Sequence, residues 1–160
     1  MELSDDRITT LVEDVKLPAD SFVTTFGDKI FQTNHNNTSV TCYTINGEKL
    51  WEFNDASVLR QPIGVAIDNN CNIYVTSYYY NKVIVLSPDG KQWRQLLDQN
   101  DGMSCPYGIY IDKTTNNILI INHKAPAFCI IFPKYRRIQS TKIFFGPNTI
   151  SREMDCFVAN

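Results

Sequence analysis

The sequence predicts an all-β protein built from repeated units of four short antiparallel strands, and three observations lead to this fold class. A segment that begins at Pro62 (Pro-Ile-Gly-Val-Ala-Ile-Asp) returns 44 residues later at Pro106 (Pro-Tyr-Gly-Ile-Tyr-Ile-Asp). Each copy is followed by further apolar runs at spacings of about ten residues, with Asn, Asp, Gly and Pro between them, as is typical of strands and turns. Asn-Gly at 46–47 and Asp-Gly at 89–90 lie between apolar alternations and favour tight hairpins.

A unit of 40 to 50 residues with four antiparallel strands is the signature of one β-propeller blade. The chain divides into a lead-in over 1–17, a degenerate blade over 18–55, blades over 56–100 and 101–140, and a tail over 141–160 that could form one further strand at 142–145. Four blades, the smallest propeller, need about 176 residues at this period, more than the 160 present. The sequence therefore predicts three to four blades in an incomplete ring, which self-association or a missing segment must complete.

The repeat assigns a structural role to its recurring residues. Gly64 is expected to remove a side chain where neighbouring first strands converge, and Asp68 to cap the following turn with its carboxylate. Gly47 and Gly90 are expected to supply the positive φ of a hairpin turn. The residues that define the repeat are Pro62, Gly64, Asp68, Asp89, Gly90, Pro106, Gly108 and Asp112.

The same residues resemble a known repeat. Pro-x-Gly-[Val/Ile]-x-Ile-Asp, followed by Asn-x-Ile-[Tyr/Leu]-[Val/Ile] and by Asn-x-Val-Ile-Val-Leu-Ser-Pro-Asp-Gly, is similar to the NHL repeat over residues 29–137. The likeness is greatest to the C-terminal propeller of invertebrate, mollusc-like tripartite-motif (TRIM) NHL proteins. It implies a fragment of a six-bladed propeller that binds a protein partner or, as an alternative, RNA. The Cys/His pairs of RING and B-box modules are absent, so this chain is not expected to carry ubiquitin-ligase chemistry.

Composition and charge argue against several other classes of protein. The formal net charge of −2 gives no bulk attraction to phosphate or anionic lipid. Five cysteines, an odd number without a Cys-x-x-Cys pair, favour reduced thiols in a cytoplasmic protein. The apolar runs, such as Ile118–Ile121, are all too short for a membrane span, and the acidic N-terminus does not resemble a secretion signal. We therefore expect no membrane partner.

Signatures of catalysis are missing from the sequence. It contains no Gly-x-Ser-x-Gly, no Gly-rich phosphate loop and no His-Glu-x-x-His, so we expect no enzyme activity, catalytic residue, metal or cofactor. His35 and His123 are expected to be surface loop residues. The alternative is a metal-dependent propeller enzyme similar to lyases and lactonases, in which Asp68 and Asp112 would point into the central channel.

Binding loops are the better candidates for function. In a propeller, the loops that join second and third strands share a face with the loops that lead into first strands, and aromatic residues beside cations there can anchor a protein or stack on bases. The competing interpretation is that one or two of three consecutive tyrosines pack against the blade and the rest are solvated. The candidate partner-binding residues are Arg60, Gln61, Tyr78, Tyr79, Tyr80, Lys82, His123 and Lys124.

Overall fold

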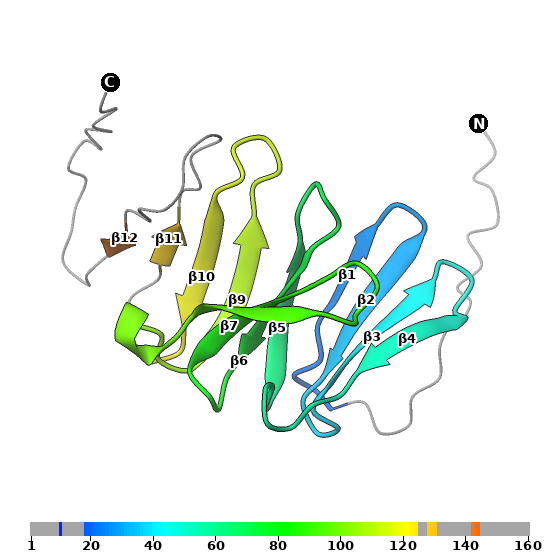
Figure 1. Ribbon diagram of the computed structural model, residues 1–160, viewed down its shortest axis with the longest axis horizontal. Coiled ribbons are helices and arrows are strands. Elements are labelled where there is room, and N and C mark those ends of the chain that lie inside the picture. Colours follow the sequence, from blue (N-terminus) through cyan, green and yellow to red (C-terminus); the bar gives the residue numbers. More distant parts are fainter. Residues whose placement is uncertain (1–9, 11–17, 125–127, 131–141, 145–160) are drawn as a thin grey trace, which may run out of the picture.

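Three antiparallel sheets of four strands each make up the computed structural model, which describes residues 10, 18–124, 128–130 and 142–144 (Figure 1). Within each sheet the strands are hydrogen-bonded in chain order. The predicted propeller-like all-β fold is confirmed, and the described sheets do not close a ring. The strands are β1 (Val23–Phe26), β2 (Lys29–Asn34), β3 (Ser39–Thr44) and β4 (Lys49–Phe53) in the first sheet, β5 (Pro62–Ile67), β6 (Ile73–Ser77), β7 (Lys82–Leu86) and β8 (Trp93–Leu97) in the second, and β9 (Pro106–Ile111), β10 (Ile118–Asn122), β11 (Phe128–Ile130) and β12 (Lys142–Phe144) in the third.

The hairpin turns between third and fourth strands have the backbone that their glycines predict. Gly47 and Gly90 have φ of 87° and 70°, and their N–H groups donate to the carbonyls of Thr44 and Ser87 at 3.0 and 2.9 Å. A side chain at Gly90 would also begin 2.6 Å from the ring of Trp51. The hairpin of the second sheet therefore packs directly against the first sheet.

The strand expected over 142–145 lies at Lys142–Phe144 and belongs to the third sheet. It pairs with β11, with Lys142 opposite Ile130. The third blade therefore includes a strand beyond residue 140, where the repeat pattern alone placed the start of the tail. The predicted lead-in other than residue 10, and the tail other than 142–144, lie outside the described residues.

Two apolar layers hold the three sheets together, and the second sheet supplies residues to both. Alternate side chains of a strand point to opposite faces, so Ile73 and Val75 of β6 pack toward the first sheet while Tyr74 packs toward the third. Every residue of β5 is buried because β5 lies between the other two sheets. The first layer contains Phe31, Val40, Cys42, Phe53, Val58, Leu59, Val65, Ile67, Ile73, Val75, Ile84 and Leu86, and the second Ala66, Tyr74, Val83, Val85, Leu97, Met103, Ile111, Ile118 and Ile120.

A threonine hydroxyl joins each sheet to the next. Thr76 Oγ1 accepts the N–H of Gly64 in its own sheet at 2.8 Å and donates to the carbonyl of Tyr107 in the third sheet at 3.1 Å. Thr33 does the same one blade earlier, where it accepts from Phe22 at 3.0 Å and donates to the carbonyl of Ile63 at 2.7 Å. The predicted role of Gly64 is confirmed, because an added Cβ there would lie 2.5 Å from the Tyr107 oxygen.

The aspartates that end the first strands cap turns. Asp68 Oδ1 accepts the N–H groups of Asn70 and Asn72 at 2.9 and 2.8 Å, as predicted, and its Oδ2 accepts the Tyr74 hydroxyl at 3.2 Å. Asp112 accepts the N–H of Thr114 at 2.8 Å in the equivalent turn.

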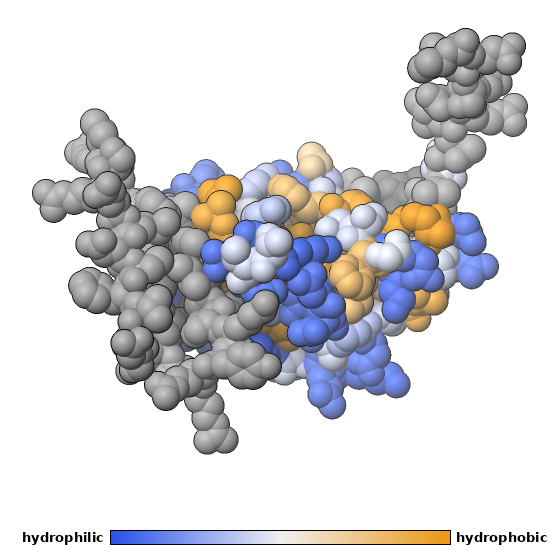
Figure 2. Space-filling view, turned by 90° about the horizontal axis from the view of Figure 1, so that it is seen from above, coloured by the Kyte–Doolittle hydropathy of each residue, from blue (hydrophilic) through white to orange (hydrophobic). Residues whose placement is uncertain are grey.

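The surface seen from above the view of Figure 1 mixes hydrophilic and hydrophobic residues and shows no single apolar patch (Figure 2).

Candidate functional site

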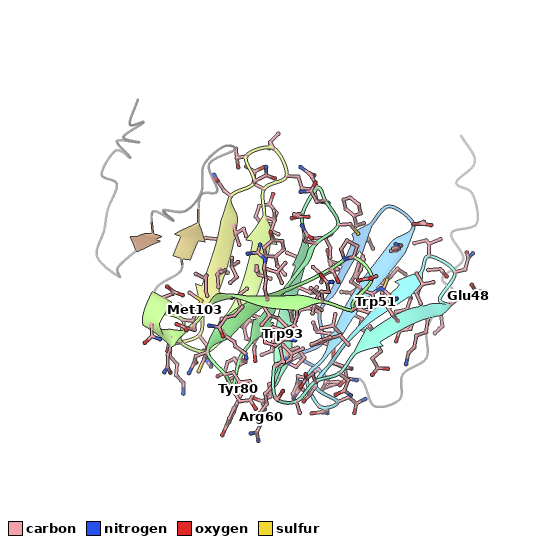
Figure 3. The ribbon with its side chains drawn as sticks, in the orientation of Figure 1. Glu48, Trp51, Arg60, Tyr80, Trp93 and Met103 are labelled. Carbon is pink, nitrogen blue, oxygen red and sulfur yellow. The ribbon has the colours of Figure 1, made fainter. Side chains whose placement is uncertain are left out.

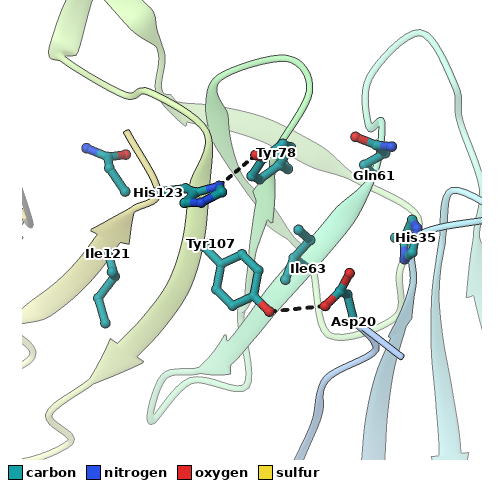
Figure 4. Close-up of a pocket in the computed structure, with 9 residues that line it drawn as sticks. Asp20, His35, Gln61, Ile63, Tyr78, Tyr107, Ile121 and His123 are labelled. Atoms are coloured by element: carbon teal, nitrogen blue, oxygen red, sulfur yellow. Dashed lines mark hydrogen bonds between the residues drawn. The ribbon is translucent and has the colours of Figure 1, made fainter. Parts of the chain in front are cut away.

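A cavity of about 630 Å³ opens where the three sheets converge, and all three contribute to its lining (Figure 4). It lies at the start of the first strands, which is the face that the sequence favours for binding. The lining mixes aromatic, apolar and polar side chains and contains one carboxylate but neither lysine nor arginine. The lining residues are Asp20, His35, Gln61, Ile63, Tyr78, Tyr107, Ile121, Asn122 and His123.

One position of the repeat places three rim residues around this cavity. His35, Tyr78 and His123 are each the first residue after the second strand of their sheet, at spacings of 43 and 45 residues. A second repeated position, between the proline and glycine of Pro-x-Gly, contributes Ile63 and Tyr107. The cavity is therefore built by the repeat itself, with different side chains from successive blades.

Left-handed backbone before each Pro-x-Gly sets the position of the rim. Gln61 and Cys105 both have φ of 50°, which is uncommon for residues with a side chain. Their carbonyls accept the N–H groups of Tyr78 and His123 at 3.1 and 2.9 Å. These bonds tie the loop that follows each second strand to the loop that precedes each first strand, so the predicted sharing of one face is confirmed.

Hydrogen bonds between side chains order the cavity wall. The Tyr78 hydroxyl and Nδ1 of His123 are hydrogen-bonded at 2.8 Å, and the Tyr107 hydroxyl donates to Asp20 at 3.2 Å (Figure 4). Burial and then the Asp20 charge raise the pKa of Tyr107, whereas burial and then the Cys105 thiol raise the pKa of Tyr78. Both phenols therefore stay protonated near neutral pH and can donate hydrogen bonds.

His35 differs from the sequence-based expectation. His123 is exposed, as predicted for a surface loop residue, but His35 is half-buried and lines the cavity. Its Nδ1 is buried and has no hydrogen-bond partner within the described part of the chain. A buried polar atom without a partner is costly, so this nitrogen is available to a ligand.

The remaining candidate residues form a separate cluster beside the cavity. The Arg60 guanidinium lies 4.1 Å from the centre of the Tyr79 ring, and the Lys82 ammonium lies 5.0 Å from that of Tyr80. The Tyr80 hydroxyl donates to the carbonyl of Ala56 at 2.8 Å. Arg60 and Tyr80 project at the lower edge of the molecule in Figure 3. These cations are already stacked on rings, as cation–π contacts require.

The structure thus divides the eight predicted residues into three groups. Gln61, Tyr78 and His123 line the cavity, while Arg60, Tyr79, Tyr80 and Lys82 form the stacked cluster. Lys124 is exposed and is not part of the cavity lining. The three consecutive tyrosines have different surroundings: Tyr79 is exposed, whereas Tyr78 and Tyr80 are half-buried.

Sequence reasoning did not identify six of the lining residues. The signal for three of them was in the repeat: His35 shares its register with Tyr78, and Ile63 and Tyr107 stand inside the recurring Pro-x-Gly. The others depend on how the sheets converge, which no local pattern shows. The residues missed are Asp20, His35, Ile63, Tyr107, Ile121 and Asn122.

The aspartates named for the alternative metal enzyme lie at the other end of the strands. Asp68 follows the end of β5, about 16 Å along an extended strand from Ile63 at the cavity. Within residues 10, 18–124, 128–130 and 142–144, no group of three histidine, cysteine, aspartate or glutamate side chains is arranged to hold a metal ion. The same residues include no helix long and apolar enough to cross a bilayer.

Comparisons with known proteins relate the fold to solved propeller structures. No protein-family model matches the chain, and no curated protein matches it. Virginiamycin B lyase from Staphylococcus aureus is similar at a TM-score of 0.61 and 17% identity, over 79% of this chain and 41% of that one. A catalytically inactive histidine-to-alanine variant of that lyase, solved with quinupristin, gives 0.62 and 16% over the same shares. A streptogramin B lyase gives 0.61 and 20%, over 79% and 40%.

At these identities the likeness shows a propeller-like fold and nothing finer. The chain spans about two-fifths of the length of these solved structures.

Proposed function

We propose that this chain is a non-catalytic propeller binding module of the TRIM NHL type, whose partner binds at the cavity face. The cavity carries the proposal, because concave sites with apolar walls and a few converging polar groups are where proteins bind ligands. Tyr78, His123 and Gln61 come together there from loops that the sequence had already favoured for binding.

The chemistry of the lining favours a protein partner over RNA. Asp20 supplies the one carboxylate among the lining residues, and neither lysine nor arginine is among them, so the cavity suits an apolar or aromatic side chain with a hydrogen-bond donor better than a phosphate. The nearby cations of Arg60 and Lys82 are engaged by tyrosine rings. The formal net charge of −2 adds no general attraction for nucleic acid.

A peptide selection tests this proposal with a matched pair of variants. A random peptide library is selected on the wild-type chain, and the affinities of enriched peptides are measured for His123→Ala and Lys124→Ala. Both residues are exposed and adjacent, but only His123 lines the cavity. We expect about tenfold weaker binding for His123→Ala and unchanged binding for Lys124→Ala, because a lost anchor contact at an interface costs about 1.4 kcal/mol or more.

A second measurement distinguishes RNA binding from binding of a protein partner. Binding of poly-U RNA is measured at about 50 and 200 mM salt, where phosphate contacts would strengthen sharply at the lower value. RNA binding that is lost in Arg60→Ala but kept in His123→Ala would replace the protein reading with an RNA-binding surface on the stacked cluster. Equal loss of peptide binding in His123→Ala and Lys124→Ala would contradict the cavity as the binding site.

A second candidate function is a lyase. His123, which is hydrogen-bonded to Tyr78, and His35 both line the cavity and favour this function together with the fold of the solved lyases. The chain is incubated with quinupristin and the mass of the antibiotic is followed, while calcium and zinc content and the melting temperature are measured before and after chelation. If the chain is a non-catalytic binding module, the mass of quinupristin stays the same, and chelation changes neither the metal content nor the melting temperature. A product whose formation depends on His123 would overturn the non-catalytic assignment.

A further inference from the structure

The third sheet carries an apolar face that points away from the second sheet. Ile118 and Ile120 of β10 are buried in the layer shared with the second sheet. Alternation along a strand therefore turns Leu119 and Ile121 to the opposite face, and Tyr110 lies directly across from Leu119. All three are exposed, with Tyr110 at 63% and Ile121 at 52%.

The equivalent face of the second sheet is covered by the third sheet. The residues in the same register there are Ala66, Tyr74 and Thr76, since Ala66 pairs with Tyr74 as Tyr110 pairs with Leu119. They are buried, and Thr76 is fully so, at 0% exposure. In the second sheet, the face equivalent to the exposed face of the third sheet is therefore an interface with another sheet.

The first sheet carries the complementary face. Val65 and Ile109 are the residues with which the second and third sheets pack against the preceding sheet. Val23 occupies the same register in the first sheet, opposite Gln32 as Val65 is opposite Val75, yet it is 58% exposed. In Figure 1 the first and third sheets lie on opposite sides of the second. The described part of the chain therefore presents one exposed face of each complementary kind.

We propose that a second copy of this chain covers both faces. The first sheet of each copy packs on the third sheet of the other, and two such contacts close a ring of six sheets. The two exposed faces are the repeat equivalents of faces that already pack against each other within one chain, so they are expected to be complementary. A closed ring leaves neither face exposed to water. This inference does not depend on the binding function proposed above.

The recurring glycine is already present at the proposed contact between the third sheet of one copy and the first sheet of the other, which we call the seam. Gly108 stands at the position of Gly64, whose missing side chain lets the next sheet approach. In the single chain an added Cβ at Gly108 meets nothing closer than 3.4 Å, and what it meets is the Ile121 side chain. Ile121 occupies the position that Thr33 and Thr76 hold in the first and second sheets. The seam between copies is therefore held by apolar packing, whereas the two contacts between sheets within one chain also have a threonine hydroxyl bridge. Ile121 and Asn122 also line the cavity, so the second copy completes its wall.

The test measures molar mass by light scattering over a range of concentrations. The expected result is a dimer of the 18.3 kDa chain that dissociates on dilution. Val23→Asp and Ile121→Lys each place an unpaired charge in both seams of the dimer, so each variant alone is expected to bind itself at least tenfold more weakly. Mixing the two variants restores a dimer, because one seam then pairs Asp with Lys and the other is wild type.

Two further variants control the interpretation. Tyr79→Asp removes an equally exposed aromatic side chain from a loop of the second sheet and is expected to leave the dimer intact. Gly108→Ala is expected to keep the melting temperature of the monomer but weaken the dimer. A wild-type chain that is monomeric at all concentrations, or that forms open polymers, overturns the proposal. So does a mixture of well-folded Val23→Asp and Ile121→Lys that stays monomeric, and if either variant fails to fold, the wild-type mass decides.

Discussion

Replacing Gly64 with alanine tests how the sheets are joined. The new Cβ would lie 2.5 Å from the carbonyl oxygen of Tyr107 and 3.1 Å from the backbone nitrogen of Ile109. Contacts of a Cβ closer than 3.0 Å are essentially never seen, so β9 must move away from β5. Because both partners are backbone atoms in a paired strand, the side chain cannot relieve the contact by turning.

The cost follows from that movement. Overpacking of a well-packed interior costs about 1–3 kcal/mol. Separating the sheets also stretches the hydrogen bond from Thr76 Oγ1 to the Tyr107 carbonyl, now 3.1 Å, and a buried hydrogen bond contributes about 0.5–1.5 kcal/mol. The lower backbone entropy of alanine offsets about 0.5–1 kcal/mol. The net expectation is about 2 kcal/mol of lost stability, or a melting temperature lower by roughly 4–8 °C.

Gly108→Ala is the matched control, since it makes the same change at the same place in the next repeat. Its Cβ has ordinary contacts of 3.4 Å and longer, so the stability is expected to be unchanged or slightly higher. Both variants are made in the Val23→Asp background, which keeps the proposed seam open, and urea unfolding is followed by circular dichroism. Equal midpoints for the two variants would refute the reasoning.

Three further predictions concern hydrogen bonds within and between the sheets. Thr76→Val leaves the N–H of Gly64 and the carbonyl of Tyr107 unpaired, so urea unfolding should show a loss of about 1–3 kcal/mol, and an unchanged midpoint would contradict the bridge. Burial, with the Asp68 charge next, raises the pKa of Tyr74 to about 12, so wild-type stability should fall as pH rises from about 10 through 12. Tyr74→Phe should lose less stability than the wild type over that pH range in thermal melts. Parallel pH profiles for the two proteins would contradict ionisation of Tyr74 as the cause. Hydrogen bonds from threonine hydroxyls lower the pKa of Asp112 to about 2, so its contribution is present above pH 3.8 and lost as pH falls through 2. The difference in melting temperature between wild type and Asp112→Asn should therefore close toward pH 2, and a constant difference would show that the turn bonds do not depend on the charge.

The strands and turns were predictable because their causes are local. Gly47 and Gly90 adopt a backbone that few other residues tolerate, and Asp68 caps a turn only two to four residues away. The role of Gly64 could be predicted too, although its contact is with a distant strand, because the repeat implies that equivalent first strands lie next to each other.

The cavity could be predicted only in part, because it depends on contacts between sheets. Gln61, Tyr78 and His123 were found from their loops, but Asp20 reaches the site by contacting Tyr107, 87 residues away. His35 sits in the weakest repeat, in which Pro18-Ala19-Asp20 stands where Pro-x-Gly opens the other two.

The first sheet shows why its opening strand is hard to recognise from the sequence. The N–H that Thr33 accepts belongs to Phe22, which therefore holds the place of Gly64 two residues after the end of the degraded Pro-x-Gly. A large side chain at this position removes the sequence signal for the first blade, although the hydroxyl bridge to the next sheet is kept.

The rim of the cavity is separate from the residues that hold the sheets together. His35, Tyr78 and His123 follow their strands rather than lying within them. The backbone N–H groups of Tyr78 and His123 make their hydrogen bonds whatever the side chain. Each can be exchanged without disturbing the apolar layers or the threonine bridges. A gene that duplicates such a blade copies the scaffold and leaves one side chain per copy free to diverge. For the binding function proposed above, a new specificity would then require only a few substitutions at one recurring position.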